Sequence, residues 1–476
     1  MKRSVPFSFF LALAVLLPVV GRAQAQSPFT LNILNPVTPG TNVATVTQGD
    51  WAQVQYTVST DFLVSRDDLV QLRRLDTDAI VSQNSPTVGQ PSAIVFLSTA
   101  PSNAVGDLKA VYVAAGGTIL ATAQQVLRVT GTGPKTVTVP SPQARTIQAG
   151  IDAVANGGTV QIGPGTFRER LLITGKQVNL VGSGSFGLKR TLIAGAIPRT
   201  IAPYERVQGL ISVGPGGGGS ISHLILQGGD AGVVGLEDSR GAPAPVRIEN
   251  TVIRMTGRGV VGSFTRLTMN RVITAGTLYH AVAITHSAAL DFFNGLVFDA
   301  GGVGLLIYNT DGPPGLINID NMSIGFCGAG GIAIVGGVKD VRIANSYATQ
   351  TWTFGILLSY AGFVEIADTY IAAIYYGGGP VYQDVADGLL SRGSHYVWIH
   401  GLLVTGCDRS GLMFDSGNGG VIQNTRTQTV RFGLVLQGDP KPDYSDPANV
   451  FQGTDEPILT DGALPVPAAP PLPDGP

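Results

Sequence analysis

The chain has 476 residues, a formal net charge of −2 and 13% charged residues. So weak a charge offers no basic field that would hold nucleic acid by counterion release, which excludes nucleic acid as an expected partner. Its 64 glycines exceed the share of roughly 7% that is usual in proteins, and they indicate a tight turn that is repeated many times.

Residues 1–25 have the three parts of a secretory signal peptide. Met1-Lys2-Arg3 is basic, an apolar run follows from Val5 to Val20, and Ala23-Gln24-Ala25 supplies the small residues of a cleavage site. The apolar run is shorter than the ~20 residues that span a bilayer, which argues against a membrane anchor. We therefore expect cleavage after Ala25, export to the periplasm or the extracellular space, and no membrane span in the mature chain.

Residues 26–131 are predicted to form a small β-sandwich of the immunoglobulin or fibronectin type. Short alternating or apolar runs are separated by Gly, Pro and Asn, a pattern typical of antiparallel strands. The Cys-Trp-Cys core of antibody domains is absent from the sequence. The expected strands are Trp51–Val58, Ala93–Ser98, Leu108–Ala114 and Gln125–Val129, and residues 131–137 are expected to be a linker.

Residues 146–156 are predicted to form a short amphipathic helix at the start of the next domain. Ile147, Ile151 and Val154 recur at helical spacing, and the pair Gly157-Gly158 ends the pattern. We expect this helix to cap the first strands of the domain, because unpaired edge strands invite aggregation.

From 132 to 438 the chain is predicted to be a right-handed parallel β-helix. Two series of positions recur at intervals of 21 to 33 residues and share the same long insertion, so they belong to one repeating unit. A leucine-rich repeat has a similar period, but it needs a Leu-rich consensus that is missing here. Short strands bounded by Gly and Asn instead fit a coil whose strands pair in parallel with the coils above and below. The first, apolar series is Val246, Leu267, Leu290, Ile317, Val341, Val364 and Val397, and the second, small series is Gly232, Gly259, Ala281, Gly304, Gly331, Gly355, Gly388, Gly411 and Gly433.

A column of asparagines marks one corner of this coil. Asn tolerates left-handed backbone at a corner, and stacked Asn side chains can hydrogen-bond along the helix axis. We therefore interpret the column as structural. Its members stand four positions after the start of a first-series strand and are Asn250, Asn294, Asn321 and Asn345, with Asp368 in the next coil.

The two cysteines are predicted to be free, buried thiols in a column of small turn residues. Cys327 and Cys407 occupy the same place in coils that are three steps apart. At about 4.8 Å per coil they stand ~14 Å apart, beyond the ~7 Å limit for a disulfide.

Residues 439–476 form a proline-rich tail with little apolar periodicity. Such a composition does not supply the apolar surface that a packed core needs. We expect the tail to be disordered or to lie extended on the surface.

The segments 146–170 (TIQAGIDAVANGGTVQIGPGTFRER) and 178–184 (VNLVGSG) resemble the start of proteins in the pectin-lyase-like superfamily. Pectinesterases and many bacterial β-helix proteins begin in this way. The resemblance covers about three fifths of the chain and implies a right-handed parallel β-helix. Members are mostly polysaccharide lyases, hydrolases, esterases and epimerases with sites on one long parallel sheet, although fold does not fix function.

No complete catalytic signature of that superfamily is present in the sequence. Asn309-Thr310-Asp311-Gly312 is similar to the first element of polygalacturonases, but their three downstream elements are absent. Val397-Trp398-Ile399-His400 is similar to a pectate-lyase segment without its aspartate, and we interpret it as a coil strand with Trp398 pointing outward. The aspartate pair of pectinesterases is missing.

Two pairs of opposite charges are expected to stack between neighbouring coils. Arg392 faces Asp415 on second-series strands, and Arg342 faces Glu365 on first-series strands. As structure, each is a surface ion pair worth at most ~1 kcal/mol. As function, Arg392 and Asp415 could bind a uronate or abstract a proton beside a sugar carboxylate. Tyr308 belongs to the same outward column as Arg392 and Asp415.

The longest coil carries an excursion over residues 373–387 with three tyrosines and two aspartates. Long loops on rigid scaffolds tend to carry function, and tyrosine rings offer flat faces to sugars. Asp384, Asp387 and a neighbouring carboxylate could hold calcium, although the spacing matches no calcium loop, and the scattered histidines imply no metal cluster. The candidate catalytic residues are Asp384, Asp387, Arg392 and Asp415, and the candidate substrate-binding residues are Tyr308, Asp311, Tyr375, Tyr376 and Tyr382.

Two hypotheses of function follow from the sequence. The first is an exported β-helix protein that binds or processes polysaccharide, uronate-containing chains included, as a lyase or a glycoside hydrolase, with the β-sandwich as a spacer. The second is a non-catalytic extracellular surface, matrix or adhesion scaffold, supported by the weakly charged columns and the incomplete signatures. The expected partner is a polysaccharide or a cell-surface glycan. No cofactor is firmly implied, and calcium is the one candidate.

Overall fold

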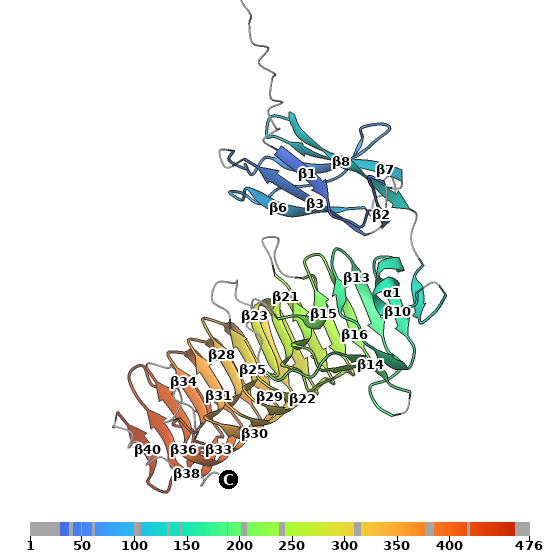
Figure 1. The fold of residues 1–476 in the computed structure, drawn as a ribbon. Coiled ribbons are helices and arrows are strands. Elements are labelled where there is room, and N and C mark those ends of the chain that lie inside the picture. The colour runs from blue at the N-terminus through green and yellow to red at the C-terminus, as the bar shows by residue number, and fades with distance from the viewer. Residues whose placement is uncertain are drawn as a thin grey trace, which may run out of the picture.

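The computed structural model describes residues 29–37, 41–48, 50–59, 62–99, 104, 106–130, 134–142, 144–187, 189–200, 207–237, 243–308, 316–376, 385–416 and 419–461. Within them the chain forms an N-terminal pair of sheets, drawn in blue, and a stack of coils that runs from green to red (Figure 1). The predicted signal peptide, residues 1–25, lies outside the described residues.

The N-terminal unit consists of two sheets that share one hydrophobic core. In its longest early strand, Ala52, Val54, Tyr56 and Val58 are buried and alternate with less buried residues, as a strand with one face on a core requires. The predicted strands are all present in outline, while the immunoglobulin or fibronectin type stays a prediction. One sheet has the order β1 (Phe29–Ile33), β3 (Trp51–Val58) and β6 (Ser92–Ser98), and the other the order β2 (Val43–Thr47), β8 (Ile119–Thr130), β7 (Gly106–Val113), β4 (Leu69–Arg74) and β5 (Ile80–Asn84).

The second unit is a parallel β-helix in which every strand pairs with the equivalent strands of the coils above and below. Its coils present three sheets, which we call faces 1, 2 and 3 in the order in which the chain visits them. Right-handed crossovers are the rule between parallel strands, and the right-handed sense predicted for this helix rests on that rule.

Face 1 begins with β9, which overlaps the end of the expected linker (residues 131–137) and pairs in parallel with β10. The strands of face 1 are β9 (Thr136–Val139), β10 (Gly158–Ile162), β13 (Gln177–Val181), β16 (Gly218–Ser222), β19 (Val246–Glu249), the ends of β21 (Arg258–Asn270) and β23 (Val282–Phe293), β26 (Leu316–Asp320), β29 (Lys339–Ala344), β32 (Gly362–Ala367), β35 (His395–His400) and β37 (Gly420–Gln423).

Face 2 follows face 1 across the asparagine corner. Its strands are β11 (Gly165–Phe167), β14 (Thr191–Ala194), β17 (Ile225–Gln227), β20 (Val252–Arg254), β22 (Ile273–Thr277), β24 (Leu296–Ala300), β27 (Ser323–Cys327), β30 (Tyr347–Trp352), β33 (Tyr370–Tyr375), the starts of β36 (Leu403–Asp415) and β38 (Arg426–Leu436), and β39 (Val450–Phe451).

Face 3 closes each coil, and its inward side chains meet those of the other faces in one continuous hydrophobic core. Its strands are β12 (Leu171–Ile173), β15 (Gly209–Val213), β18 (Ala231–Gly235), the starts of β21 and β23, β25 (Val303–Tyr308), β28 (Gly330–Val335), β31 (Phe354–Ser359), β34 (Asp387–Arg392), the ends of β36 and β38, and β40 (Glu456–Thr460).

The strand register confirms the predicted repeat. Each member of the apolar series is the direct partner of the next, from Val246 with Leu267 to Val364 with Val397. The small series is aligned in the same way, because each member directly precedes an aliphatic residue that pairs with its equivalent in the next coil. For example, Ile356 pairs with Leu389, and Gly355 and Gly388 precede them. The interpretation of the chain as a parallel β-helix is therefore confirmed.

The asparagine corner between faces 1 and 2 is also confirmed. All five predicted members have positive φ, from 43° at Asp368 to 53° at Asn294. The Nδ2 of Asn321 donates to the Oδ1 of Asn294 at 2.8 Å, while Asn345 donates to Asp320 instead. The column thus holds the tight turn and bonds partly along the axis, partly to the neighbouring strand end.

Both cysteines are free and buried, as predicted. Burial raises the pKa of the Cys327 thiol to about 12 and raises that of Cys407 as well, so neither is a reactive thiolate. The expectation of small neighbours holds for Cys327, which pairs with Ala300, but was wrong for Cys407, which pairs with Ile374 below and Val430 above. The column faces the core, and the core accepts large aliphatic residues there.

Helix α1 (Ile147–Ala153) caps the first coils and is shorter than expected. The Thr146 side chain accepts a hydrogen bond from the Ala149 amide, and the Glu169 carboxylate accepts from the amides of Ile147 and Gln148. The helix ends at Ala153 because the next residue, Val154, is extended (φ −73°, ψ 146°) and fully buried in the core. Of the glycine pair that suggested a later end, Gly157 lies in a turn and Gly158 begins β10.

The parallel stacking continues past residue 438, where the proline-rich composition suggested a boundary. Strands β39 and β40 pair with β38, so one more coil extends to Thr460. Short strands of two and five residues can pair even where prolines interrupt the apolar pattern that sequence reading depends on. The remaining part of the predicted tail, residues 462–476, lies outside the described residues.

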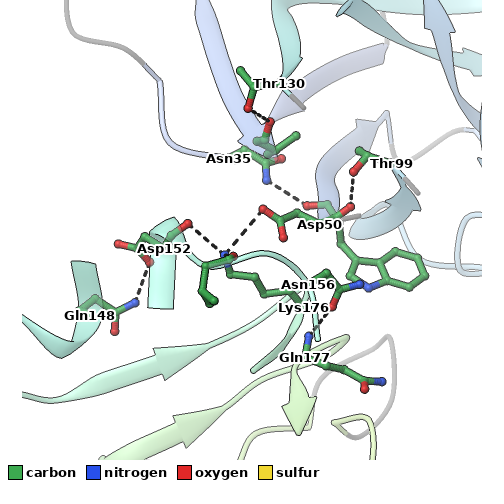
Figure 2. A network of polar contacts seen from close by, with 12 residues as sticks. Asn35, Asp50, Thr99, Thr130, Gln148, Asp152, Asn156, Lys176 and Gln177 are labelled. Atoms are coloured by element: carbon green, nitrogen blue, oxygen red, sulfur yellow. Dashed lines mark hydrogen bonds and ion pairs between the residues drawn. The ribbon is translucent and has the colours of Figure 1, made fainter. Parts of the chain in front are cut away.

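A buried ion pair joins the N-terminal unit to the cap of the β-helix (Figure 2). The Nζ of Lys176 lies 3.7 Å from Asp50 Oδ2 and donates to the carbonyl oxygens of Asp152 and Val154, each at 3.0 Å. Burial lowers the pKa of Lys176, and the charges of Asp50 and Asp152 partly oppose that shift. One ammonium group therefore serves both the end of α1 and the junction with the N-terminal unit.

Candidate functional site

The described residues predicted to be functional fall into two groups rather than one. Tyr375, Tyr376 and Asp387 lie where face 2 turns into face 3, on either side of residues 377–384. Arg392 and Asp415 lie at the other end of face 3, in one column with Tyr308. The other predicted residues, Asp311, Tyr382 and Asp384, lie outside the described residues.

An exposed pair of rings stands at the first of these places. Trp352 ends β30, Tyr375 ends β33, and the two are register partners with ring centroids 6.0 Å apart. Their exposed fractions are 46% and 41%. They point outward because Gln350 and Ala373, two residues earlier, have left-handed backbone (φ 51° and 56°) and shift the alternation of the strand.

Charged residues continue the column in the next coils. Asp408 follows Cys407 and Arg431 follows Val430, and these preceding residues are stacked on Ile374, the neighbour of Tyr375. Arg431 forms an ion pair with Asp455 at 2.7 Å. We call the six residues Trp352, Tyr375, Tyr376, Asp408, Arg431 and Asp455 the corner site.

Tyr376 links the rings of the corner site to its charges. Its backbone N–H donates to Asp408 Oδ2 at 3.1 Å, and its hydroxyl donates to the Asp408 carbonyl oxygen at 3.4 Å. Burial raises the pKa of Tyr376, while the charges of Arg409 and Arg431 oppose the shift. The hydroxyl is therefore protonated at neutral pH, and its one proton is directed at the Asp408 carbonyl oxygen.

Asp387 lies directly behind the corner site and is fully buried. Its carboxylate accepts hydrogen bonds from Arg409, at 2.8 Å from Nε and also from Nη2, and from the Ser410 hydroxyl. A buried carboxylate with bidentate Arg and Ser partners stabilises the local structure, and removing it would leave a buried cation unpaired. The catalytic role predicted for Asp387 stays a prediction, and this environment favours a structural role.

The predicted pair on face 3 is present. Arg392 Nε lies 2.9 Å from Asp415 Oδ2, with the two side chains 51% and 24% exposed. Tyr308 is three coils away in the same column, ~14 Å at about 4.8 Å per coil. Tyr308 therefore does not contact the pair directly, and a ligand that touched all three would have to lie along the helix axis.

The Arg342–Glu365 pair on face 1, interpreted from the sequence as a surface ion pair, belongs to a larger polar cluster. Glu365 Oε2 lies 3.3 Å from Arg342 Nε, and Glu365 Oε1 lies 3.0 Å from His400 Nε2. The Trp398 indole N–H donates to Gln423 at 3.1 Å, and its ring lies 4.8 Å from that of His400. Trp398 points outward as predicted, with 47% of its surface exposed.

Among the residues that the structure describes, no group of three or more His, Cys, Asp or Glu side chains is placed to hold a metal ion. The proposed calcium ligand Asp384 lies outside those residues, and Asp387 is engaged by Arg409. Calcium binding stays a prediction. The described part of the chain also contains no helix that is long and apolar enough to cross a membrane.

Comparison with known proteins gives structural likenesses only. No family model matches the chain, and no curated protein matches it. The catalytic domain of a GH87 α-1,3-glucanase in complex with nigerose is 12% identical, with a TM-score of 0.47 over 91% of this chain and 96% of that chain. The mannuronan C-5 epimerase A-module of Azotobacter vinelandii is 17% identical, with a TM-score of 0.41 over 67% and 94%.

A third likeness is to the family 28 exopolygalacturonase of Yersinia enterocolitica, which is 10% identical, with a TM-score of 0.32 over 87% of this chain and 96% of that chain. The solved structures that the chain resembles are pectin-lyase-like β-helix proteins, the superfamily that residues 146–184 resemble. The strand register itself establishes the fold as a parallel β-helix.

Proposed function

We propose that the chain is an exported protein whose β-helix binds a polysaccharide at the corner site. The observation that carries this proposal is the exposed Trp352–Tyr375 ring pair, which continues directly into the charged column of Asp408 and Arg431. Ring faces pack against the apolar C–H faces of sugars, and a few polar groups beside them fix orientation through the hydroxyls.

Binding is better supported than turnover at the corner site. Asp408 accepts from the Tyr376 amide, Asp455 is paired with Arg431, and Asp387 is buried with Arg409. A general acid or base must instead reach the proton that it transfers. We propose further that residues 26–131 are an immunoglobulin-like or fibronectin-like spacer and that residues 1–25 direct export.

The binding proposal is tested by affinity electrophoresis of the full secreted chain in a panel of neutral and uronate polysaccharides. We expect at least one polysaccharide to retard the protein, and the Trp352→Ala, Tyr375→Ala double variant to lose about tenfold in affinity, since full burial of a large apolar side chain is worth roughly 1.5–3 kcal/mol and these rings are about half exposed without a ligand. Phe186→Ala removes a ring that is 70% exposed elsewhere and should change nothing. Equal loss in both variants would contradict a specific role of the corner.

Polysaccharide processing is the second candidate, favoured by the half-exposed Arg392–Asp415 pair. Incubation of the protein with the same panel, with calcium and with chelator, would reveal new reducing ends or unsaturated uronate absorbance. Activity lost in Arg392→Ala, Asp415→Ala and Asp384→Ala would support the enzyme. Retardation without turnover supports the binding protein. If no polysaccharide retards the protein and none is degraded, the result supports the matrix scaffold.

A further inference from the structure

Four aromatic rings are exposed within two successive coils of the β-helix, away from the corner site. Phe363 and Tyr396 stack almost in parallel, with ring centroids 5.0 Å apart and 9° between their planes. They are 55% and 66% exposed, and Tyr360 and Trp398 beside them are 64% and 47% exposed. So much exposed ring surface in one place marks a binding surface on a soluble protein.

The backbone holds the stacked rings outward. Phe363 and Tyr396 occupy one position in adjacent strands β32 and β35, and both have left-handed backbone (φ 52° and 55°). Phe363 and Tyr396 are left out of the strand pairing, because Gly362 pairs with His395 and Val364 with Val397. Bulky residues rarely adopt this conformation, so its repetition fixes the two rings in a set orientation.

Polar groups border the rings on the same two strands. Glu365 and His400 are 31% and 29% exposed at their side chains and lie 3.0 Å apart, with Arg342 on the other carboxylate oxygen. The guanidinium of Arg342 is turned toward Glu365, so these two groups compensate each other's charge. Such a cluster can form hydrogen bonds with the hydroxyl groups of a neutral sugar. It lacks the uncompensated cation that would attract a sugar carboxylate.

We infer that face 1 carries a second carbohydrate site, formed by Phe363, Tyr396 and Trp398 with Glu365 and His400, whose ligand is a neutral pyranose chain. The rings would support the C–H faces of consecutive sugars, and the carboxylate and imidazole would accept and donate hydrogen bonds to their hydroxyls. The asparagine corner separates this site from face 2, so it is independent of the corner site in the proposed function.

The tryptophans allow each site to be observed alone. The chain has three, and Trp51, Trp352 and Trp398 lie in the N-terminal unit, at the corner site and on face 1. The Trp51→Phe, Trp352→Phe variant leaves Trp398 as the single reporter of face 1. The Trp51→Phe, Trp398→Phe variant leaves Trp352 as the single reporter of the corner.

Fluorescence titration of both variants with laminarihexaose, cellohexaose, maltohexaose and oligogalacturonate tests the inference. We expect a saturable change in Trp398 emission with at least one neutral oligosaccharide and a weaker one with oligogalacturonate. Adding Tyr396→Ala should weaken the neutral ligand about tenfold, while adding Phe186→Ala should leave it unchanged.

The outcomes separate this inference from the proposed function. Trp398 emission that no sugar alters overturns the face 1 site, whatever Trp352 reports. A response of Trp398 without one of Trp352 supports face 1 and removes the corner site. A stronger response of Trp398 to oligogalacturonate than to the neutral chains overturns the ligand class.

Discussion

The glycines of the small series lie where each coil turns into face 3, and most leave no space for a side chain. A β-carbon at Gly355 would lie 2.3 Å from Ile371 Cγ2 and 2.7 Å from the Gly388 carbonyl oxygen. Gly388 and Gly411 meet similar obstacles from Val404 and Thr427. Face 2 and face 3 approach each other closely at this corner, and the missing β-carbon permits it.

Replacing Gly355 with alanine is therefore expected to destabilise the β-helix. A clash with backbone cannot be relieved by a rotamer change, and overpacking of this kind costs about 1–3 kcal/mol. Gly362→Ala is the matched control, because its β-carbon would meet only the flexible Lys339 side chain at 3.6 Å. Denaturant unfolding should show a lower midpoint for Gly355→Ala alone, and equal midpoints would contradict the packing argument.

His280 makes stability depend on pH. The residue is buried, its Nδ1 accepts a hydrogen bond from the Val303 amide at 3.0 Å, and burial, followed by the charge of Arg258, lowers its pKa from 6.5 to about 4. As the pH falls from 6.5 to 4, the unfolded chain binds a proton that the folded chain does not, so stability is lost across this range, by about 3 kcal/mol in all.

The His280→Asn variant should remove most of this dependence. Its amide oxygen can replace the acceptor Nδ1, and the group does not titrate. Unfolding free energies measured at intervals between pH 4 and 7 should fall steeply for the wild type and less for the variant. Parallel curves for the two proteins would assign the acid sensitivity to other groups.

Among the elements, α1 depends on side chains that come from outside the helix. Glu169 binds its first amides and Lys176 binds its last carbonyls, while the seven-residue helix contributes no acidic residue in its first turn and no basic one in its last. So short a helix is marginal alone. Its position over the first coil is thus set by the turns before and after β12, which carry these two charges.

Lys176→Met should weaken both α1 and the junction with the N-terminal unit. The variant leaves the carbonyl oxygens of Asp152 and Val154, of which the second is buried, without this donor and removes the cation beside Asp50, which is expected to cost about 1–3 kcal/mol. Lys189→Met, at an exposed position, is the control. Faster proteolysis near residues 131–145 in the first variant only would support this, and identical digestion of both would refute it.

The elements that could be predicted from the sequence are those with a strict period. Val246 to Val397 face the core in every coil, and Asn250 to Asp368 occupy a corner that only a few residue types tolerate, so both series recur visibly. Arg392 and Asp415 followed from the same counting.

The corner site did not follow from that counting. The left-handed residues Gln350 and Ala373 interrupt the two-residue alternation, so Trp352 and Tyr375 point outward where the period places them inward. The burial of Asp387 could not be predicted either, because it depends on the side chains of Arg409 and Ser410 in the next coil. The positions of these side chains depend on local left-handed residues and on contacts between coils, which the repeat period does not reveal.

At the scale of the whole molecule, the three faces differ in what they expose. Face 1 carries ion pairs and the stacked rings of Phe363 and Tyr396, and face 2 carries exposed rings that include Phe298 and Tyr347. On face 3, outward aliphatic residues are buried in clusters of their own, such as Leu390 with Met413.

Because each coil pairs only with the two beside it, the ladder hydrogen bonds run along the axis of the stack. Tension applied to the two ends would act parallel to these bonds and break them one coil at a time, whereas bonds perpendicular to the force would all be loaded together. Each released coil would yield about 80 Å of slack at roughly 3.4 Å per residue. Under tension such a protein would extend by unfolding one coil at a time, while the remaining coils stay folded.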